Sequence, residues 1–213
     1  MRALPSSTRA AIFVAATLLL IAILPAVGGC GDTAPRSENY FALVGGNSWL
    51  YEGSQEGQKV SVEMKVQKPD ASLNLSPGIL DIAVTGSLGD YRVSESGLFL
   101  EAGPTEVKLW GVKESGGTPR FFGSPYIWLR QPLQVGTSYN TAIQGAPAPA
   151  RMLVSGRQKV PTPWGERDGF MLEEVGGSGA AAGVRLVFVP YLGFTRINTP
   201  DWPELQLKDA SLR

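Results

Sequence analysis

The strongest constraint on the fold is an alternation of apolar and polar residues with a period of two. Residues 59–67 place valine or methionine at every second position, with lysine, serine, glutamate or glutamine between them, and residues 80–85 show a similar alternation. Successive side chains of a β-strand point to opposite faces, so each segment predicts a strand with one dry and one wet face. No stretch after residue 30 shows the 3.6-residue period of an amphipathic helix. The pattern predicts an all-β chain.

Glycine and proline mark the connections between these strands. The chain has 26 glycines and 16 prolines without a fixed spacing, which suits many short strands joined by tight turns. The clearest turn signals include Ser76-Pro77-Gly78, Ser115-Gly116-Gly117, and Ser96-Gly97, which we expect to separate strands at 91–93 and 98–101. We predict ten or more mainly antiparallel strands in one strongly curved sheet or open barrel.

The first 30 residues have the features of an export signal. Arg2 and Arg9 precede an apolar segment at 10–27, which is too short to span a membrane comfortably. The sequence Val27-Gly28-Gly29-Cys30 then resembles the lipobox of bacterial lipoproteins, in which the cysteine thiol receives a diacylglycerol. We expect residues 1–29 to be cleaved and Cys30 to carry the lipid. The alternative is an uncleaved N-terminal anchor whose cysteine is incidental.

The remaining chain predicts one tethered domain in the cell envelope. Residues 30–39 form a lipidated cysteine with a polar, flexible tether, and residues 40–213 form a single β-rich domain. Acyl chains such as palmitate on Cys30 would hold the protein to a membrane on its periplasmic side. Gly31 follows the cysteine where an aspartate would favour inner-membrane retention, so the outer membrane of a Gram-negative cell is favoured.

A short internal similarity suggests that the domain has two related halves. Residues 42–49 (ALVGGNSW) and 132–139 (PLQVGTSY) share a leucine, a glycine, a serine and a final aromatic residue at the same spacing. The two segments lie 90 residues apart, so each would begin one half of the domain. The alternative is chance similarity over eight residues.

Three segments resemble, in order, a large group of bacterial envelope lipoproteins of unknown function. Residues 40–51 (YFALVGGNSWLY) are similar to its opening YFPL-x-x-G-x-x-W-x-Y motif. Residues 158–170 resemble its V-x-V-P-A-G-x-F segment, and residues 189–207 resemble its closing segment, which ends in E-L-x-L. Ala42 in place of proline, and Trp164, depart from the pattern. The resemblance implies an open β-barrel similar to the lipoprotein carriers LolA and LolB, and no known reaction.

Residue types exclude most catalytic and nucleic-acid-binding chemistry. The chain has no histidine, one cysteine, and equal numbers of basic and acidic residues, without a basic stripe. The glycine-rich residues 177–183 precede a predicted strand rather than the helix of a nucleotide-binding loop. Glu166, Asp168, Glu173 and Glu174 are close in sequence and are interpreted as solvated strand charges. We therefore predict no enzyme activity, no catalytic residues, no cofactor, no metal site and no nucleic-acid partner.

An aromatic cluster is the one candidate binding feature. Phe121, Phe122, Tyr126 and Trp128 lie within eight residues, and Trp110 can join them across the sheet. These five rings could line an apolar pocket in the mouth of a barrel, and the alternative is ordinary core packing. We predict a non-enzymatic module that binds a lipid or another hydrophobic ligand. The alternative is a structural accessory subunit that docks an envelope protein.

Overall fold

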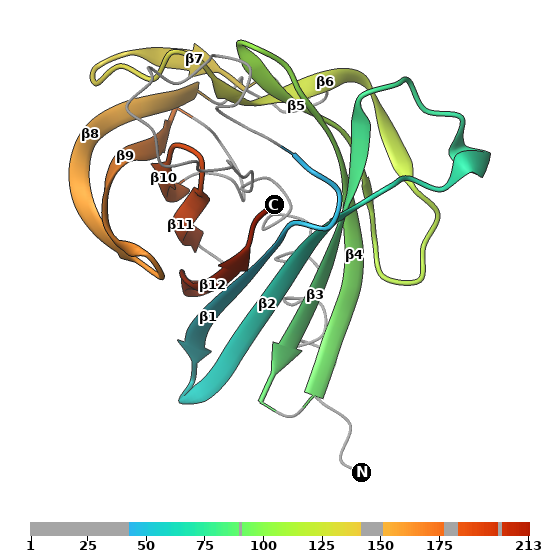
Figure 1. Ribbon diagram of the computed structural model, residues 1–213, viewed down its shortest axis with the longest axis horizontal. Coiled ribbons are helices and arrows are strands. Elements are labelled where there is room, and N and C mark those ends of the chain that lie inside the picture. The colour runs from blue at the N-terminus through green and yellow to red at the C-terminus, as the bar shows by residue number, and fades with distance from the viewer. Residues whose placement is uncertain (1–42, 90, 142–150, 177–182, 200–201) are drawn as a thin grey trace.

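The computed structural model describes residues 43–89, 91–141, 151–176, 183–199 and 202–213, which form twelve strands in one sheet (Figure 1). Cys30, its predicted tether and the predicted export signal lie outside these ranges. The strands are β1 (Ser48–Gln55), β2 (Gln58–Gln67), β3 (Ile79–Leu88), β4 (Tyr91–Ala102), β5 (Glu106–Lys113), β6 (Arg120–Arg130), β7 (Ser138–Asn140), β8 (Arg151–Thr162), β9 (Gly165–Val175), β10 (Arg185–Val189), β11 (Gly193–Thr199) and β12 (Trp202–Ser211).

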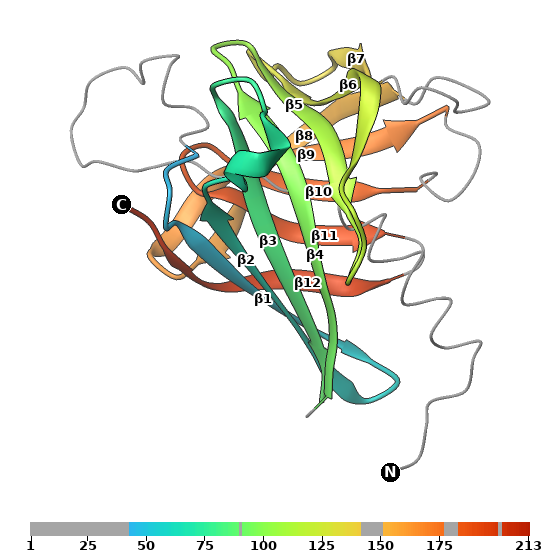
Figure 2. The ribbon, with the colours of Figure 1, turned by 90° about the vertical axis from the view of Figure 1, so that its right-hand side faces the viewer.

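The sheet curls into a barrel that is closed except at one seam. Its strand order is β6-β5-β4-β3-β2-β1-β12-β11-β10-β9-β8-β7, and each neighbouring pair is antiparallel. The terminal strands β6 and β7 therefore flank the seam. Figure 2 shows the long strands of the first half crossing the strands of the second half. The predicted all-β, antiparallel, open-barrel fold is confirmed.

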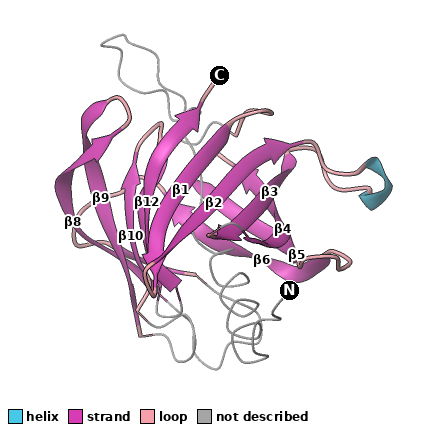
Figure 3. Ribbon diagram, turned by 90° about the horizontal axis from the view of Figure 1, so that it is seen from below, coloured by secondary structure: helices cyan, strands magenta, loops and turns pink. Residues whose placement is uncertain are grey.

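Helical structure is slight in the described ranges. A three-residue 3-10 helix, η2 (Ala71–Leu73), projects from the barrel between β2 and β3 (Figure 3). Asp70 caps it by accepting a hydrogen bond from the Ser72 amide at 2.8 Å. None of the described helical structure is long and apolar enough to cross a membrane.

The barrel interior is filled by the apolar faces that the alternation predicted. Val60, Val62, Met64 and Val66 of β2 are all buried, and the polar residues between them face outward. Aromatic rings from distant strands meet in the centre, where Phe194 of β11 packs edge-on against other rings. Its centroid lies 5.4 Å from that of Phe188 and 6.4 Å from that of Trp128.

One predicted turn is wrong, because Ser96 and Gly97 lie inside β4, which continues from Tyr91 to Ala102. Glycine serves close packing at this position rather than a change of chain direction. A Cβ at residue 97 would lie 3.1 Å from the Asp81 carboxylate on β3, which is tighter than ordinary van der Waals contact.

The two halves predicted from the internal similarity begin with the same hydrogen-bonded turn. In each half a glycine with positive φ donates its amide hydrogen to a valine carbonyl in the second strand of that half. The amide of that valine donates to the residue after the glycine. The bonds are Gly46–Val66 and Val66–Asn47 in the first half, and Gly136–Val154 and Val154–Thr137 in the second, all between 2.8 and 2.9 Å. Each half then contributes six strands, β1–β6 and β7–β12.

Candidate functional site at the barrel seam

Side chains, rather than a backbone ladder, bridge the seam in the described part of the chain. Tyr139 of β7 donates its hydroxyl hydrogen to the Trp128 carbonyl of β6, and the two oxygens lie 3.1 Å apart. Both side chains are buried. Trp128 is the extra residue of a β-bulge, because β6 pairs Leu129 with Val107 and Ile127 with Lys108. Trp128 shares the inward face with Tyr126, two residues earlier, and its carbonyl accepts the hydrogen bond from Tyr139.

The equivalent junction on the other side of the barrel is sealed by strand pairing. Trp49 of β1 occupies the position that Tyr139 has in the second half, and it also donates from its ring to a main-chain carbonyl. Its Nε1 lies 3.0 Å from the Leu192 oxygen. However, β1 pairs directly with β12 over residues 48–52, whereas β7 and β6 are the two ends of the sheet order. The seam between β6 and β7 is thus unpaired, whereas strand pairing closes the corresponding junction between β1 and β12.

Polar groups gather on the interior side of the seam. The Tyr126 hydroxyl of β6 hydrogen bonds with Thr141, the residue after β7, and lies close enough to Glu174 of β9 for their charges to interact. Burial raises the pKa of Tyr126 to about 12; the Thr141 bond opposes this rise, and the Glu174 charge adds to it. Burial likewise raises the pKa of Tyr139. The three elements therefore bring two tyrosines, a threonine and a carboxyl together.

The interpretation of the carboxylates at residues 166–174 as solvated strand charges is wrong for Glu174. Glu174 shares a strand face with Phe170 and Leu172, both of which are buried. Burial raises the pKa of Glu174 to about 7, and its Oε1 is buried without a hydrogen-bond partner among the described residues. The Trp128 Nε1 is likewise buried without such a partner. Glu174 thus has a buried acceptor and Trp128 a buried donor without a partner among the described residues, which is costly unless another group meets them.

The five predicted ligand-binding rings do not form one cluster. Tyr126 and Trp128 are buried in the interior, and Phe122 packs against the same core. Trp110 and Phe121 belong to the outer face. Trp110 is the extra residue of a bulge in β5, and its Nε1 donates to the Glu101 carboxylate at 2.7 Å.

Phe121 covers Phe99 on the outside of the sheet, with the two ring centroids 4.9 Å apart. Gly111 of β5 makes this contact possible. A Cβ there would lie 2.7 Å from both the Phe121 ring and the Arg120 carbonyl. Four residues of β6, numbers 122–125, have no partner on β5 between the pairs Gly111–Phe121 and Leu109–Tyr126. This long bulge separates Phe121 from the interior rings that follow it.

A cavity of about 470 Å³ lies on the outer face of β2–β5. The cavity has room because Ala83 carries a small side chain and Gly97 carries none. Asp81 and Lys113 also line it. Asp81 accepts a hydrogen bond from Gln67 at 2.9 Å. Burial raises the Asp81 pKa, although the Gln67 bond and the Lys113 charge oppose the rise. This polar cavity is distinct from the apolar pocket expected behind residues 121–128, which stays a prediction.

Tyr139, Thr141 and Glu174 were not predicted as site residues from the sequence. Tyr139 had a usable signal, because it aligns with the buried Trp49 in the internal similarity. Glu174 had a weaker signal, since it follows Phe170 and Leu172 at the spacing of one strand face. Nothing in the sequence indicated that β7 and β9 place these residues beside Tyr126.

Acidic residues do not converge on a metal-binding arrangement in the described ranges, where no group of three or more His, Cys, Asp or Glu side chains could hold an ion.

Comparison with known proteins found no matching family model, no matching curated protein and no matching solved structure.

Proposed function

We propose that this protein is a membrane-anchored lipoprotein of the cell envelope whose barrel binds a lipid or another hydrophobic molecule through the seam, without catalysis. The observation that supports this most is the contrast between the two equivalent junctions. β1 and β12 are joined by strand pairing, whereas the Tyr139 side chain bridges β7 and β6. Few hydrogen bonds must break to part β6 from β7, so this junction should open first.

The side chains at the seam indicate the chemistry of the ligand. Tyr126 and Trp128 would contact an apolar chain, while the unsatisfied Glu174 Oε1 and Trp128 Nε1 would meet a polar head group. Binding sites for such molecules are mostly apolar with a few polar groups that set the orientation. We infer a ligand with a long apolar part and a head group that both donates and accepts hydrogen bonds, such as a protonated fatty acid or a fatty alcohol.

The proposed membrane attachment rests on the sequence Val27-Gly28-Gly29-Cys30. Acyl chains on Cys30 would keep the barrel at the membrane surface, on the periplasmic side and preferably at the outer membrane. A hydrophobic ligand would then be exchanged with the bilayer over a short distance. Two or more acyl chains make such an anchor lasting, because a single chain binds only marginally.

Ligand binding can be tested with a fluorescent fatty acid and the domain from Arg36 onward. We expect saturable binding with micromolar affinity, equivalent to about 8 kcal/mol. Trp128→Ala and Phe122→Ala should weaken it, and Phe121→Ala on the outer face is the matched control. Mass spectrometry of the intact protein, gently extracted from its native membrane, should show both the lipid on Cys30 and any co-purified ligand.

A structural role is the second candidate, and the packing of the interior favours it. Trp49, Tyr51, Phe188 and Phe194 are fully buried in the barrel, and the first two are bonded to main-chain carbonyls. If no lipid class binds the domain, these rings are core, and an accessory subunit of an envelope complex becomes the better proposal.

A further inference from the structure

The turn between β8 and β9 presents an indole to solvent. We define the hairpin tip as residues 161–165 (PTPWG), beyond Val160, which is buried at 3% exposure. Trp164 is 47% exposed, and Pro161 and Pro163 beside it are exposed as well. The hairpin forms the orange arm at the left of Figure 1 and ends in this narrow turn. A tryptophan in such a place contributes nothing to the core.

The backbone of the hairpin tip is largely satisfied from within. Pro161 and Pro163 have no N–H group to satisfy. The Trp164 amide donates to the Thr162 hydroxyl at 3.2 Å, and that hydroxyl donates to the Gly165 carbonyl at 2.6 Å. Thr162 and Gly165 are also cross-strand partners. Unsatisfied backbone groups are what chiefly oppose the transfer of a turn out of water, so this turn is suited to surroundings of low polarity.

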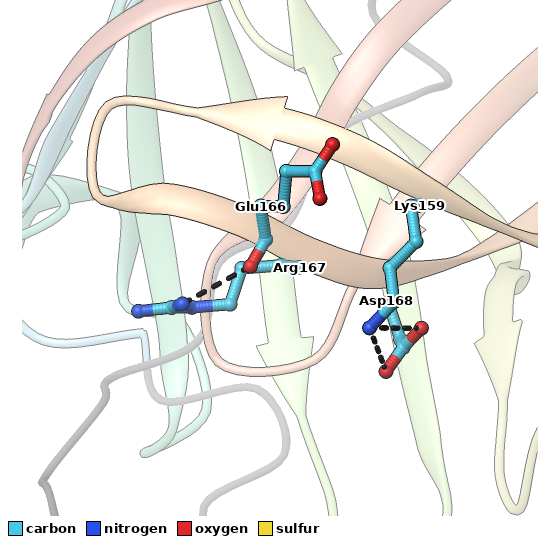
Figure 4. A network of polar contacts seen from close by, with 4 residues as sticks. All are labelled: Lys159, Glu166, Arg167 and Asp168. Carbon is cyan, nitrogen blue, oxygen red and sulfur yellow. Dashed lines mark hydrogen bonds and ion pairs between the residues drawn. The ribbon is translucent and has the colours of Figure 1, made fainter.

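A charged collar follows the tip on both strands (Figure 4). It consists of Lys159, Glu166, Arg167 and Asp168, so two cations and two anions balance. Lys159 and Asp168 form an ion pair at 3.0 Å, and Arg167 donates to the Glu166 carbonyl at 3.1 Å. All four side chains are exposed. The arm therefore changes from apolar to charged within one or two residues of the turn.

We propose that the hairpin tip inserts Trp164 into the head-group region of a lipid bilayer, as a second membrane contact beside the N-terminal lipid. Indole rings favour this region, where the ring is partly dry and its N–H stays hydrated. The charged collar would remain among the head groups. A protein partner fits less well, because three apolar residues offer far less than the roughly 800 Å² that each side of a standard protein interface buries.

The proposal rests on the lipid anchor of the proposed function but not on ligand binding. One indole binds a bilayer weakly, and the anchor supplies the high local concentration that makes such a contact persistent. Because the collar is balanced in charge, the contact should form on zwitterionic lipid and should resist salt.

The test is the quenching of tryptophan emission in the full-length lipidated protein, reconstituted in phosphatidylcholine vesicles with and without brominated acyl chains. Brominated lipid should quench part of the wild-type emission, equally at low and high salt. Trp164→Ala should reduce that quenching to the level seen without bromine. Trp110→Phe is the control, because Trp110 lies on the outer face of β5, and it should leave the quenching unchanged.

Flotation of the same vesicles separates the possible failures. A wild-type protein that floats but is not quenched, or whose quenching survives Trp164→Ala, overturns the insertion of the tip. A protein that does not float overturns the anchor and the tip together. Fatty-acid binding is measured separately, so its loss would contradict the ligand proposal alone.

Discussion

The hydroxyl of Tyr139 lies 3.1 Å from the carbonyl oxygen of Trp128, and this contact joins the two strands that the sheet leaves unpaired. The corresponding aromatic residue of the first half, Trp49, lies on a strand paired on both sides. This buried side-chain bond thus spans the seam at a position where the other half of the barrel has a full ladder.

Tyr139→Phe should loosen the seam. The change leaves the Trp128 carbonyl without its partner and should cost about 1–3 kcal/mol of unfolding free energy. Tyr51→Phe is the matched control, because the Tyr51 hydroxyl donates to the Phe194 carbonyl at 2.9 Å within the sealed part of the barrel. Urea unfolding should show that both variants lose a similar amount of unfolding free energy. Stopped-flow binding of a fluorescent fatty acid should become faster only for Tyr139→Phe, and equal rates for the two variants would argue against entry at the seam.

Because of Glu174, the free energy of unfolding of the barrel should be larger in mild acid than at neutral pH. The pKa of Glu174 is raised from the ordinary 4.5 to about 7, so between these values the folded protein holds a proton that the unfolded chain has lost. The free energy of unfolding should therefore fall as the pH rises from about 4.5 to 7. The carboxyl is only partly buried, so solvent screening limits the effect to on the order of 1 kcal/mol.

Urea unfolding at pH 5 and pH 8 measures this difference. Glu174→Gln should remove this contribution and be more stable than the wild type at pH 8. Glu173→Gln, on the opposite face of the same strand, should leave the pH dependence in place. A difference in stability between pH 5 and pH 8 that is the same in the wild type and in Glu174→Gln would contradict the inward position of Glu174.

Gly53→Ala should weaken the sealed junction between β1 and β12. A Cβ at residue 53 would lie 2.6 Å from the main-chain oxygen of Glu204, which cannot move without displacing β12. We expect a loss of about 1–3 kcal/mol, as for other overpacked sites. Gly45→Ala is the control, since no atom lies within 4 Å of its added Cβ and its φ is not positive. Thermal unfolding should place Gly45→Ala at or slightly above the wild type.

Cys30→Ser should abolish lipid attachment and leave the precursor uncleaved. Cys30 is the only cysteine in the chain, so no other thiol can take the lipid. Metabolic labelling with palmitate, followed by electrophoresis, measures both effects at once. Ala42→Pro, a change outside the predicted lipobox, is a control that should keep the label. Labelling that persists in Cys30→Ser would refute the anchor.

Local pattern was sufficient for the fold class and for the faces of many strands. The alternation at residues 59–67 assigned Val60, Val62, Met64 and Val66 to the interior, because side chains alternate wherever a strand is regular. The similarity of residues 42–49 and 132–139 located the start of each half, because the positive φ of Gly46 and of Gly136 is a property of a short segment. The hydrogen bonds of these turns reach Val66 and Val154 in a later strand, and the short segments did not predict those partners.

The tertiary structure alone decided which aromatic residues meet. Bulges in β5 and β6 interrupt the regular pairing beside Trp110 and Trp128, and the Trp128 ring packs against Phe194 of the distant strand β11. A bulge is defined by the partner strand, which the sequence of one strand does not specify. The same holds for Gly97, whose lack of a side chain serves contact with Asp81 on the neighbouring strand.

The sequence by itself determined that this chain makes strands and which face of β2 is buried, and it predicts a lipid at the N-terminal end. Only the tertiary structure decided that β1 closes on β12, that β7 fails to close on β6, and that Tyr126, Thr141 and Glu174 gather behind that gap. Strand formation depends on neighbours along the chain, whereas barrel closure depends on strand number, twist and stagger summed over the whole sheet.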